Sequence, residues 1–284
     1  MLKAILLSML MILMAAVGAA AEDRAPAGYL VKMQLAGADA VAKSVVIRNG
    51  GEISARLMMP LYDGDVVFVR DPKSRVGVEL GDGTAMTLGQ GVARFELKGE
   101  IDTGDGTLGI LAAIAGVFSG EGDQTPENMA AKGAALKMPM AIRGANMILA
   151  GRDRLWLAWE GGKAPYGIAY AKSNGKVIRV TLPIESTFGS ISIRSEREEK
   201  FLIIITDSEG QRLSARFRFA DALPADSPIT GTSQASFLAK AAWLTSQYGW
   251  RVEAVQMLND VKTDAALALR DKIVAGWSYE PAAP

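Results

Sequence analysis

Few side chains in this sequence are suited to covalent chemistry. The 284 residues include no histidine and no cysteine, the side chains most often used as general base, soft metal ligand or thiol nucleophile. Ser173 and Lys176 match the Ser-x-x-Lys spacing of serine acyltransferases, but Asn174 and Gly175 lie between them. That chemistry needs the serine at the start of a helix, whereas Asn-Gly is typical of a hairpin turn. We therefore expect a turn here and no nucleophile.

Carboxylates are the remaining candidates for metal binding or acid–base catalysis. Five aspartates lie in closely spaced groups: Asp63, Asp65, Asp82, Asp102 and Asp105. A calcium loop needs acids at alternate positions, and Gly104 stands where the second ligand should be. Aspartate is also a common turn residue, because its side chain accepts backbone N–H groups two residues on. We predict no catalytic, cofactor-binding or metal-binding residue.

One enzymatic alternative stays open, a hydrolase that acts on envelope glycan with two carboxylates alone. The chain has 31 acidic residues to draw on, but no spacing singles out a pair. No glycine-rich nucleotide-binding motif occurs either. We predict that the protein is not an enzyme, needs no cofactor and acts by binding.

The tryptophans are the best candidates for such binding. Trp156 and Trp159 are three residues apart in one predicted strand, and side chains at that spacing point to opposite faces. One ring should lie in the core, and the other should be exposed or covered by a neighbouring module. We predict a protein contact at one of these two residues.

The N-terminus resembles a secretory signal. Residues 1–21 combine Lys3, a short apolar run and small residues that end at Ala21. The apolar run is shorter than the roughly 20 residues that span a bilayer, so we predict cleavage, a periplasmic location and no transmembrane span in the processed protein. The processed chain has 30 basic and 31 acidic residues. This balance gives no overall attraction to nucleic acid or anionic lipid, and we expect another envelope protein as the partner.

Residues 22–98 read as a small β domain. Six short apolar runs, at residues 45–48, 53–57, 65–70, 76–80, 85–88 and 93–97, are separated by glycine-containing turn signals. Val76, Val78 and Leu80 alternate with Gly77 and Glu79, which predicts a strand with one buried face. Residues 66–69 are apolar without interruption, so that strand should be buried on both sides.

This region resembles the periplasmic domain of FecR-type regulators. The resemblance is carried by Leu61, Gly64, Asp65, Asp82 and Gly83, with the strands between and after them. It implies a small all-β module with a role in signalling or envelope scaffolding and without a catalytic site. Full-length regulators have a membrane span before this domain, so the chain looks more like a stand-alone exported protein. A periplasmic signalling component remains an alternative function.

Three further segments follow. Residues 99–136 are a glycine-rich linker with one apolar helix, whose inward face we place on Leu108, Leu111, Ala112, Ala115 and Phe118. Residues 137–223 contain seven strand-like runs, the expectation for an immunoglobulin-like or fibronectin-like sandwich. Residues 224–284 are predicted to form a C-terminal helical cap of three helices, the first and third capped by Ser233 and Thr263.

The predicted fold class is mainly β and multi-domain: a FecR-like β module, an Ig-like β-sandwich and the helical cap. The predicted function is non-enzymatic binding or scaffolding in the periplasm, as an adaptor of an envelope or sensory complex.

Overall fold

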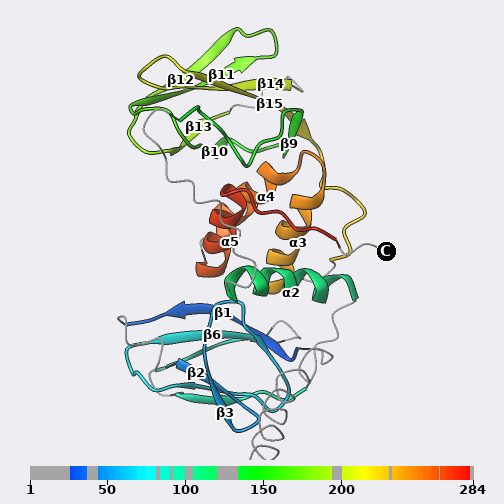
Figure 1. The fold of residues 1–284 in the computed structure, drawn as a ribbon. Helices are drawn as coiled ribbons and strands as arrows, with labels where there is room; N and C mark the ends of the chain where they lie inside the picture. Colours follow the sequence, from blue (N-terminus) through cyan, green and yellow to red (C-terminus); the bar gives the residue numbers. More distant parts are fainter. Residues whose placement is uncertain are drawn as a thin grey trace, which may run out of the picture.

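Two β-sandwiches flank a layer of helices. The computed structural model describes residues 26–36, 44–80, 84–89, 92–99, 105–119, 134–193, 200–229, 232–261 and 263–281. Strands β1–β8 form the first sandwich and strands β9–β15 the second. Helices α2–α5, the helical layer, lie between them (Figure 1). The C-terminal helices therefore touch both sandwiches instead of capping one end of the molecule.

The first sandwich consists of two four-stranded sheets. One sheet has the order β4-β1-β6-β7, from Pro60–Leu61, Gly28–Gln34, Arg75–Leu80 and Ala85–Leu88. The other has the order β3-β2-β5-β8, from Gly51–Ser54, Ser44–Arg48, Val66–Val69 and Arg94–Glu96. All strand pairs within both sheets are antiparallel. The predicted strand at residues 53–57 is in fact β3 and ends at Ser54, and strand β1 was not predicted.

The two sheets share a core of their own. Leu30, Val76 and Val78 from one sheet and Val46 and Val67 from the other belong to a single buried cluster. Strand β5 lies inside its sheet between β2 and β8, and Val66, Val67 and Val69 are buried. Phe68, on the same face as Val66, is only partly buried, so the predicted burial on both sides is incomplete at this residue.

Strand β6 is buried on both faces, which corrects the prediction of a single buried face. Gly77 and Glu79 are buried although they alternate with the core valines. The helical layer covers this second face: Oε1 of Glu79 accepts a hydrogen bond from the backbone N–H of Ala235, in the first turn of α3, at 2.9 Å. A carboxylate is favourable there because the first N–H groups of a helix have no partner within the helix.

The second sandwich is asymmetric. Its larger sheet has the order β12-β11-β14-β15-β9, from Val177–Ile184, Tyr166–Lys172, Lys200–Thr206, Arg212–Ala220 and Ala145–Leu149. Only the β15–β9 pair is parallel. Strands β10, Arg154–Ala158, and β13, Phe188–Ser192, form the smaller sheet. Between β11 and β12 Gly175 has φ +86° and its N–H donates to Lys172 O at 2.8 Å, so Ser173 to Lys176 form the expected hairpin turn.

The helical layer contains α2, Asp105–Ser119, and three consecutive helices, Gln234–Ser246, Arg251–Val261 and Asp264–Val274, labelled α3 to α5. Ser233 and Thr263 cap α3 and α5 as predicted. Helix α2 packs against α3, but its buried face differs from the predicted one. Ile110, Leu111 and Ile114 are buried, whereas Ala112 is exposed.

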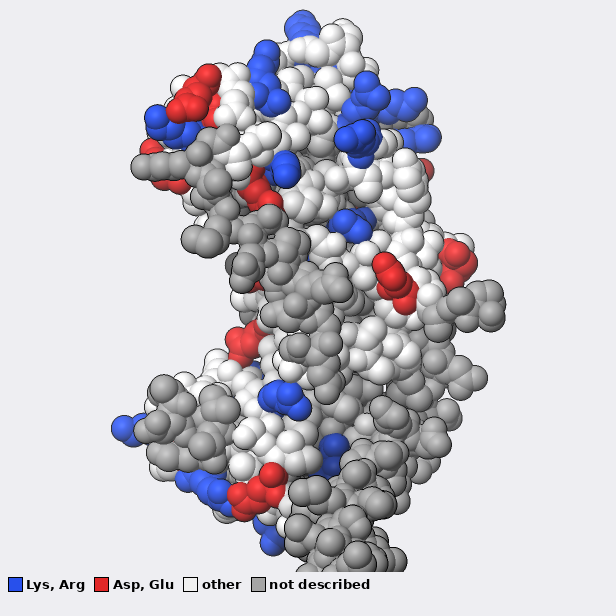
Figure 2. All heavy atoms as spheres, in the orientation of Figure 1, with Lys and Arg blue, Asp and Glu red and all other residues white. Residues whose placement is uncertain are grey.

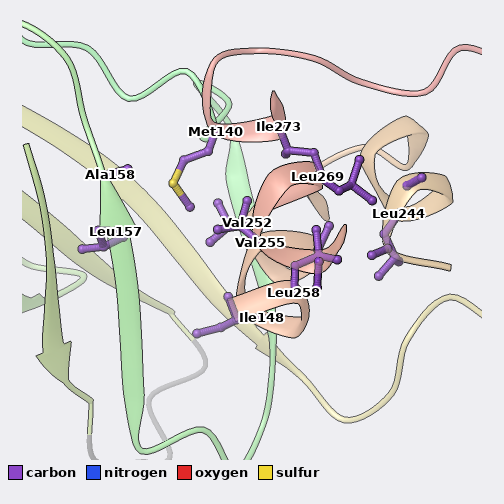
Figure 3. Packing of buried hydrophobic residues seen from close by; sticks show 14 of the residues in the cluster. Met140, Ile148, Leu157, Ala158, Leu244, Val252, Val255, Leu258, Leu269 and Ile273 are labelled. Atoms are coloured by element: carbon purple, nitrogen blue, oxygen red, sulfur yellow. The ribbon is translucent and has the colours of Figure 1, made fainter. Parts of the chain in front are cut away.

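A second buried cluster joins the helical layer to both sandwiches. It includes Tyr29 and Val31 from β1, the core of the second sandwich and the inward residues of all four helices. Figure 3 shows Val252, Val255 and Leu258 of α4 facing Ile148 of β9 on one side and the neighbouring helices on the other. Burial in this cluster raises the pKa of the Tyr29 hydroxyl.

The predicted fold class is confirmed: the described chain is mostly β, in several antiparallel sheets, with a C-terminal helical segment. The predicted domain boundaries stay a prediction, and the signal at residues 1–21 lies outside the described residues. Within the described ranges, no helix has both the length and the apolar character of a membrane span.

We predict that Glu79 holds the first sandwich on α3. Glu79→Ala should lower the free energy of unfolding by about 2 kcal/mol, because it removes a buried hydrogen bond to a charged acceptor. Glu79→Gln keeps an acceptor oxygen and should lose less. Urea denaturation followed by tryptophan fluorescence measures both. Glu96→Ala, at an exposed position of β8, is the control, and an equal loss in all three variants would contradict the prediction.

Candidate interaction surface

An aromatic and cationic cluster covers the outer side of the smaller sheet of the second sandwich. Trp156 of β10 lies opposite Ser190 of β13, and Phe188 lies diagonally from it. The two rings are stacked, with centroids 6.3 Å apart and planes 27° apart. The guanidinium of Arg270, from α5, lies over the Trp156 ring, 4.8 Å from its centroid. We call Trp156, Phe188 and Arg270 the Trp156 face.

Helix α4 fixes the backbone under the Trp156 face. The Gln256 side chain accepts from Trp156 N and donates to Trp156 O, both at 2.8 Å. The amide thus pairs with strand β10 as a neighbouring strand would. Gln256 is buried, so both halves of its amide need these partners.

A buried ion pair attaches α4 to strand β9 and to the residues that follow this strand. Glu253 is fully buried and accepts from Leu149 N at 3.0 Å and from Nε and the terminal nitrogen of Arg152. Arg152 also binds Asp260 at 2.7 Å. Burial alone would lower the pKa of Arg152, but the hydrogen bonds and charges of Glu253 and Asp260 outweigh burial and raise it. Arg152 therefore stays charged, and Glu253 keeps its counter-ion.

Trp159 lies on the opposite side of the strand, inside the second sandwich. It is only 3% exposed and meets Tyr166 edge-on, with ring centroids 5.3 Å apart. Its Nε1 has no hydrogen-bond partner among the described residues. The sequence predicted that the two tryptophans face opposite ways, and they do. Trp159 is a core residue, so only Trp156 remains available for the predicted contact, which stays a prediction.

Phe188 and Arg270 were not predicted, yet they decide what the Trp156 face can do. Phe188 is 55% exposed. Its ring is therefore open to solvent while it stacks on Trp156, whose backbone is bound by Gln256. A pre-positioned aromatic pair with an adjacent cation suits the contact of an apolar or aromatic side chain bordered by an acid. The Trp156 face contains no group that could act as a nucleophile.

The residues of the FecR-type motif have structural roles where the structure describes them. Leu61 is buried in β4, and Gly64 has φ +82° in the turn before β5. Asp65 is buried and accepts from Arg48 at 2.7 Å and from Tyr62 N at 2.9 Å, while Arg48 also donates to Pro60 O at 2.8 Å. Asp82 and Gly83 lie outside the described residues.

The other aspartates form no site in the described chain. Asp63 accepts from Gly99 N at 2.8 Å, and Asp105 is the first residue of α2. Asp102 lies outside the described residues. In the ranges that the structure describes, no group of three or more acidic, histidine or cysteine side chains is placed to hold a metal ion.

Comparisons with known proteins identify no family. No family model and no curated protein sequence matches the chain. The FecR-type resemblance therefore stays a prediction.

Three solved structures are distantly similar. CopC from Methylosinus trichosporium OB3b is 15% identical over 26% of this chain and 80% of its own, with a TM-score of 0.21. The BSP domain of a biofilm-associated protein is 12% identical over 70% of this chain and 26% of its own, with a TM-score of 0.23. Immunoglobulin domains 1–5 of Sidekick-1 are 13% identical over 69% of this chain and 38% of their own, with a TM-score of 0.22. At these TM-scores the similarities bear on neither fold nor function.

We predict that Gln256 keeps the Trp156 face in place. Gln256→Met retains the length of the side chain but leaves the N–H and C=O of Trp156 without their partner. The free energy of unfolding should fall by about 2 kcal/mol, since two hydrogen bonds contribute roughly 1 kcal/mol each. The Trp156 amide should exchange its hydrogen faster in the variant. Unchanged exchange at Trp156 would show that Gln256 does not support the strand.

We predict that the Asp65–Arg48 pair stabilises the first sandwich far more than a surface pair does. Asp65→Asn should cost about 3 kcal/mol, because it leaves a mostly buried guanidinium without its counter-ion. Glu52 and Arg70 form an ion pair that is about half exposed, so Glu52→Gln should cost less than about 1 kcal/mol. Urea denaturation of both variants gives the comparison. Equal costs would mean that Asp65 acts only as a turn residue.

Proposed function

We propose that this protein is a non-enzymatic binding and scaffold protein that uses the Trp156 face to hold a partner protein. The proposal rests on one observation: Phe188 stands 55% exposed on Trp156, whose backbone is fixed by Gln256 and whose ring lies under Arg270. Ordering an exposed aromatic group before binding lowers the entropy that association costs. Interfaces concentrate their binding energy in such aromatic and arginine residues.

The contacts of the helical layer support a scaffold role. The first sandwich is attached to α3 through Glu79, and the second to α4 through Glu253 and Gln256. These contacts are buried and directional, so they favour one relative placement of the two sandwiches. An adaptor that holds two partners at a set spacing needs such a connection.

The proposed setting is the bacterial periplasm. It rests on the signal-like residues 1–21 and on the resemblance of residues 22–98 to FecR-type periplasmic domains. That resemblance extends the proposal to an envelope or sensory complex, in which the protein contacts another envelope protein. Both β modules would then serve as contact surfaces.

We predict that a photoreactive group at position 188 captures the partner. Phe188→p-benzoylphenylalanine, expressed in the native cell and irradiated, should give a discrete crosslinked species of higher mass. Val92 in the first sandwich is 54% exposed, so the same group at position 92 is a control of equal accessibility. Crosslinking at position 188 should exceed that at position 92 several-fold. Equal yields at both positions, or none at 188, would overturn the assignment of the binding surface.

A further inference from the structure

Positive charge is concentrated in the larger sheet of the second sandwich. Its five strands contain six basic residues and no acidic one: Lys172, Arg179, Lys200, Arg212, Arg216 and Arg218. The strands of the first sandwich contain four basic and three acidic residues. The net charge of the whole chain is near zero, but the strands of this sheet carry only positive charges. Figure 2 shows lysine and arginine side chains gathered on the upper part of the molecule, where this sheet lies.

Most of these cations share the outer face of the sheet. On β15 the alternate residues Phe217 and Ala215 are buried in the core, so Arg212, Arg216 and Arg218 point outward and are exposed. Lys200 of β14 is exposed directly opposite Arg218. Among the described residues, Arg212, Arg216 and Lys200 form no ion pair with an acidic side chain. Alternate residues of a strand are about 7 Å apart, so Arg216 and Arg218 are neighbours in a column along β15. Arg212 lies about 14 Å from Arg216 in the same column, with Ser214 between them.

Apolar side chains complete the same outer face. The strand register places Val180 beside Ala169 and Ile204, and Val177 beside Ala171 and Leu202. Val177 and Val180 are 46% and 50% exposed, and Ile178 between them is 40% exposed. Three strand spacings, about 14 Å in all, separate this apolar edge from the cationic column on β15. We call the two together the cationic sheet face.

The free edge of β12 is poorly suited to the addition of another strand. Its pairing with β11 shifts register twice, and Pro183 near its end has no N–H to donate. Arg179 adds an exposed charge. Bulges, proline and charge are the devices by which proteins prevent strand addition at an edge. The exposed Val177, Ile178 and Val180 therefore serve as surface, not as the start of a longer sheet.

Two acids in the turn between β14 and β15 are engaged elsewhere. Asp207, in the turn between β14 and β15, is buried and accepts from the backbone N–H groups of Lys163, Glu209 and Gln211. Glu209 pairs with the ammonium of Lys163 at 3.1 Å. Neither of these two carboxylates pairs with Arg212 or Arg216 in the described chain.

We propose that the cationic sheet face binds the surface of an anionic lipid bilayer. Its arginines would contact lipid phosphates while Val177 and Val180 enter the interface, and each cation near such a surface adds to the affinity. A bilayer offers negative charge and apolar depth over a flat area wider than the 14 Å between the two columns. A second copy of this chain would instead bring its four outward cations against the first four, which disfavours self-association.

We predict binding to vesicles of phosphatidylglycerol and phosphatidylcholine, and none to vesicles of phosphatidylcholine alone. In co-sedimentation at low salt, Arg212→Gln with Arg216→Gln should weaken binding at least about tenfold. Val180→Ser should also weaken it. The control removes the same charge elsewhere: Arg94→Gln with Arg154→Gln, both at exposed positions outside this sheet, should change binding less than about twofold. Circular dichroism checks that every variant is folded.

Other outcomes would overturn the proposal. Equal losses in the two double variants would show that overall charge, not this face, drives binding. If Val180→Ser has no effect and soluble heparin displaces the protein fully, the face binds anionic polymers instead of a bilayer. If light scattering shows dimers that Val180→Ser dissociates, a second copy occupies the face. Crosslinking at position 188 tests the scaffold function separately, because position 188 lies outside this sheet.

Discussion

The structure depends on two polar side chains of α4 that are buried and satisfied. Glu253 would be costly to bury without Arg152 and the N–H of Leu149, and Gln256 without the backbone of Trp156. Apolar contacts such as those of Val252, Val255 and Leu258 allow many helix positions of similar energy. A shift of α4 by one turn would separate Glu253 from its counter-ion. These two residues therefore set the one position at which the helix fits the sheet.

That position has consequences for the surface. Helix α5 follows α4 after a very short connection, so fixing α4 on β10 also places Arg270 over Trp156. Trp156 in turn supports Phe188. The position of the exposed Phe188 ring thus depends, through Trp156, on the buried side-chain amide of Gln256 in α4. At the other end of the layer, Glu79 gives α3 its contact with the first sandwich.

The sequence predicts elements better than it predicts what covers them. Alternation, glycine turns and helix caps locate most strands and helices, including the caps at Ser233 and Thr263. Strand β1 was missed because Tyr29, Leu30 and Val31 are all buried, two against the helices and one in the sandwich, so no alternation marks it. Glu79 is predicted on a solvent-exposed face for a different reason: the alternation of β6 suggests one exposed face, and the helix that covers this face is 156 residues away in the sequence.

Surface properties were the least predictable. Trp156 and Trp159 could be assigned to opposite faces from their spacing, but Phe188 and Arg270 join Trp156 only through tertiary contacts. Net charge was likewise uninformative, because it sums over the chain. The cations of the larger sheet become one face only when the register of β11, β12, β14 and β15 is known.

The two proposed surfaces lie on opposite sides of the second sandwich. In stacked sheets about 10 Å apart, the residues that do not face the core point away from each other. The cationic sheet face is the outer side of the five-stranded sheet, and Trp156 is on the outer side of the β10–β13 sheet. A protein that rests on a bilayer by the first surface therefore turns the second away from it. A membrane contact and a partner contact at the Trp156 face are then sterically compatible, and binding at one leaves the other accessible.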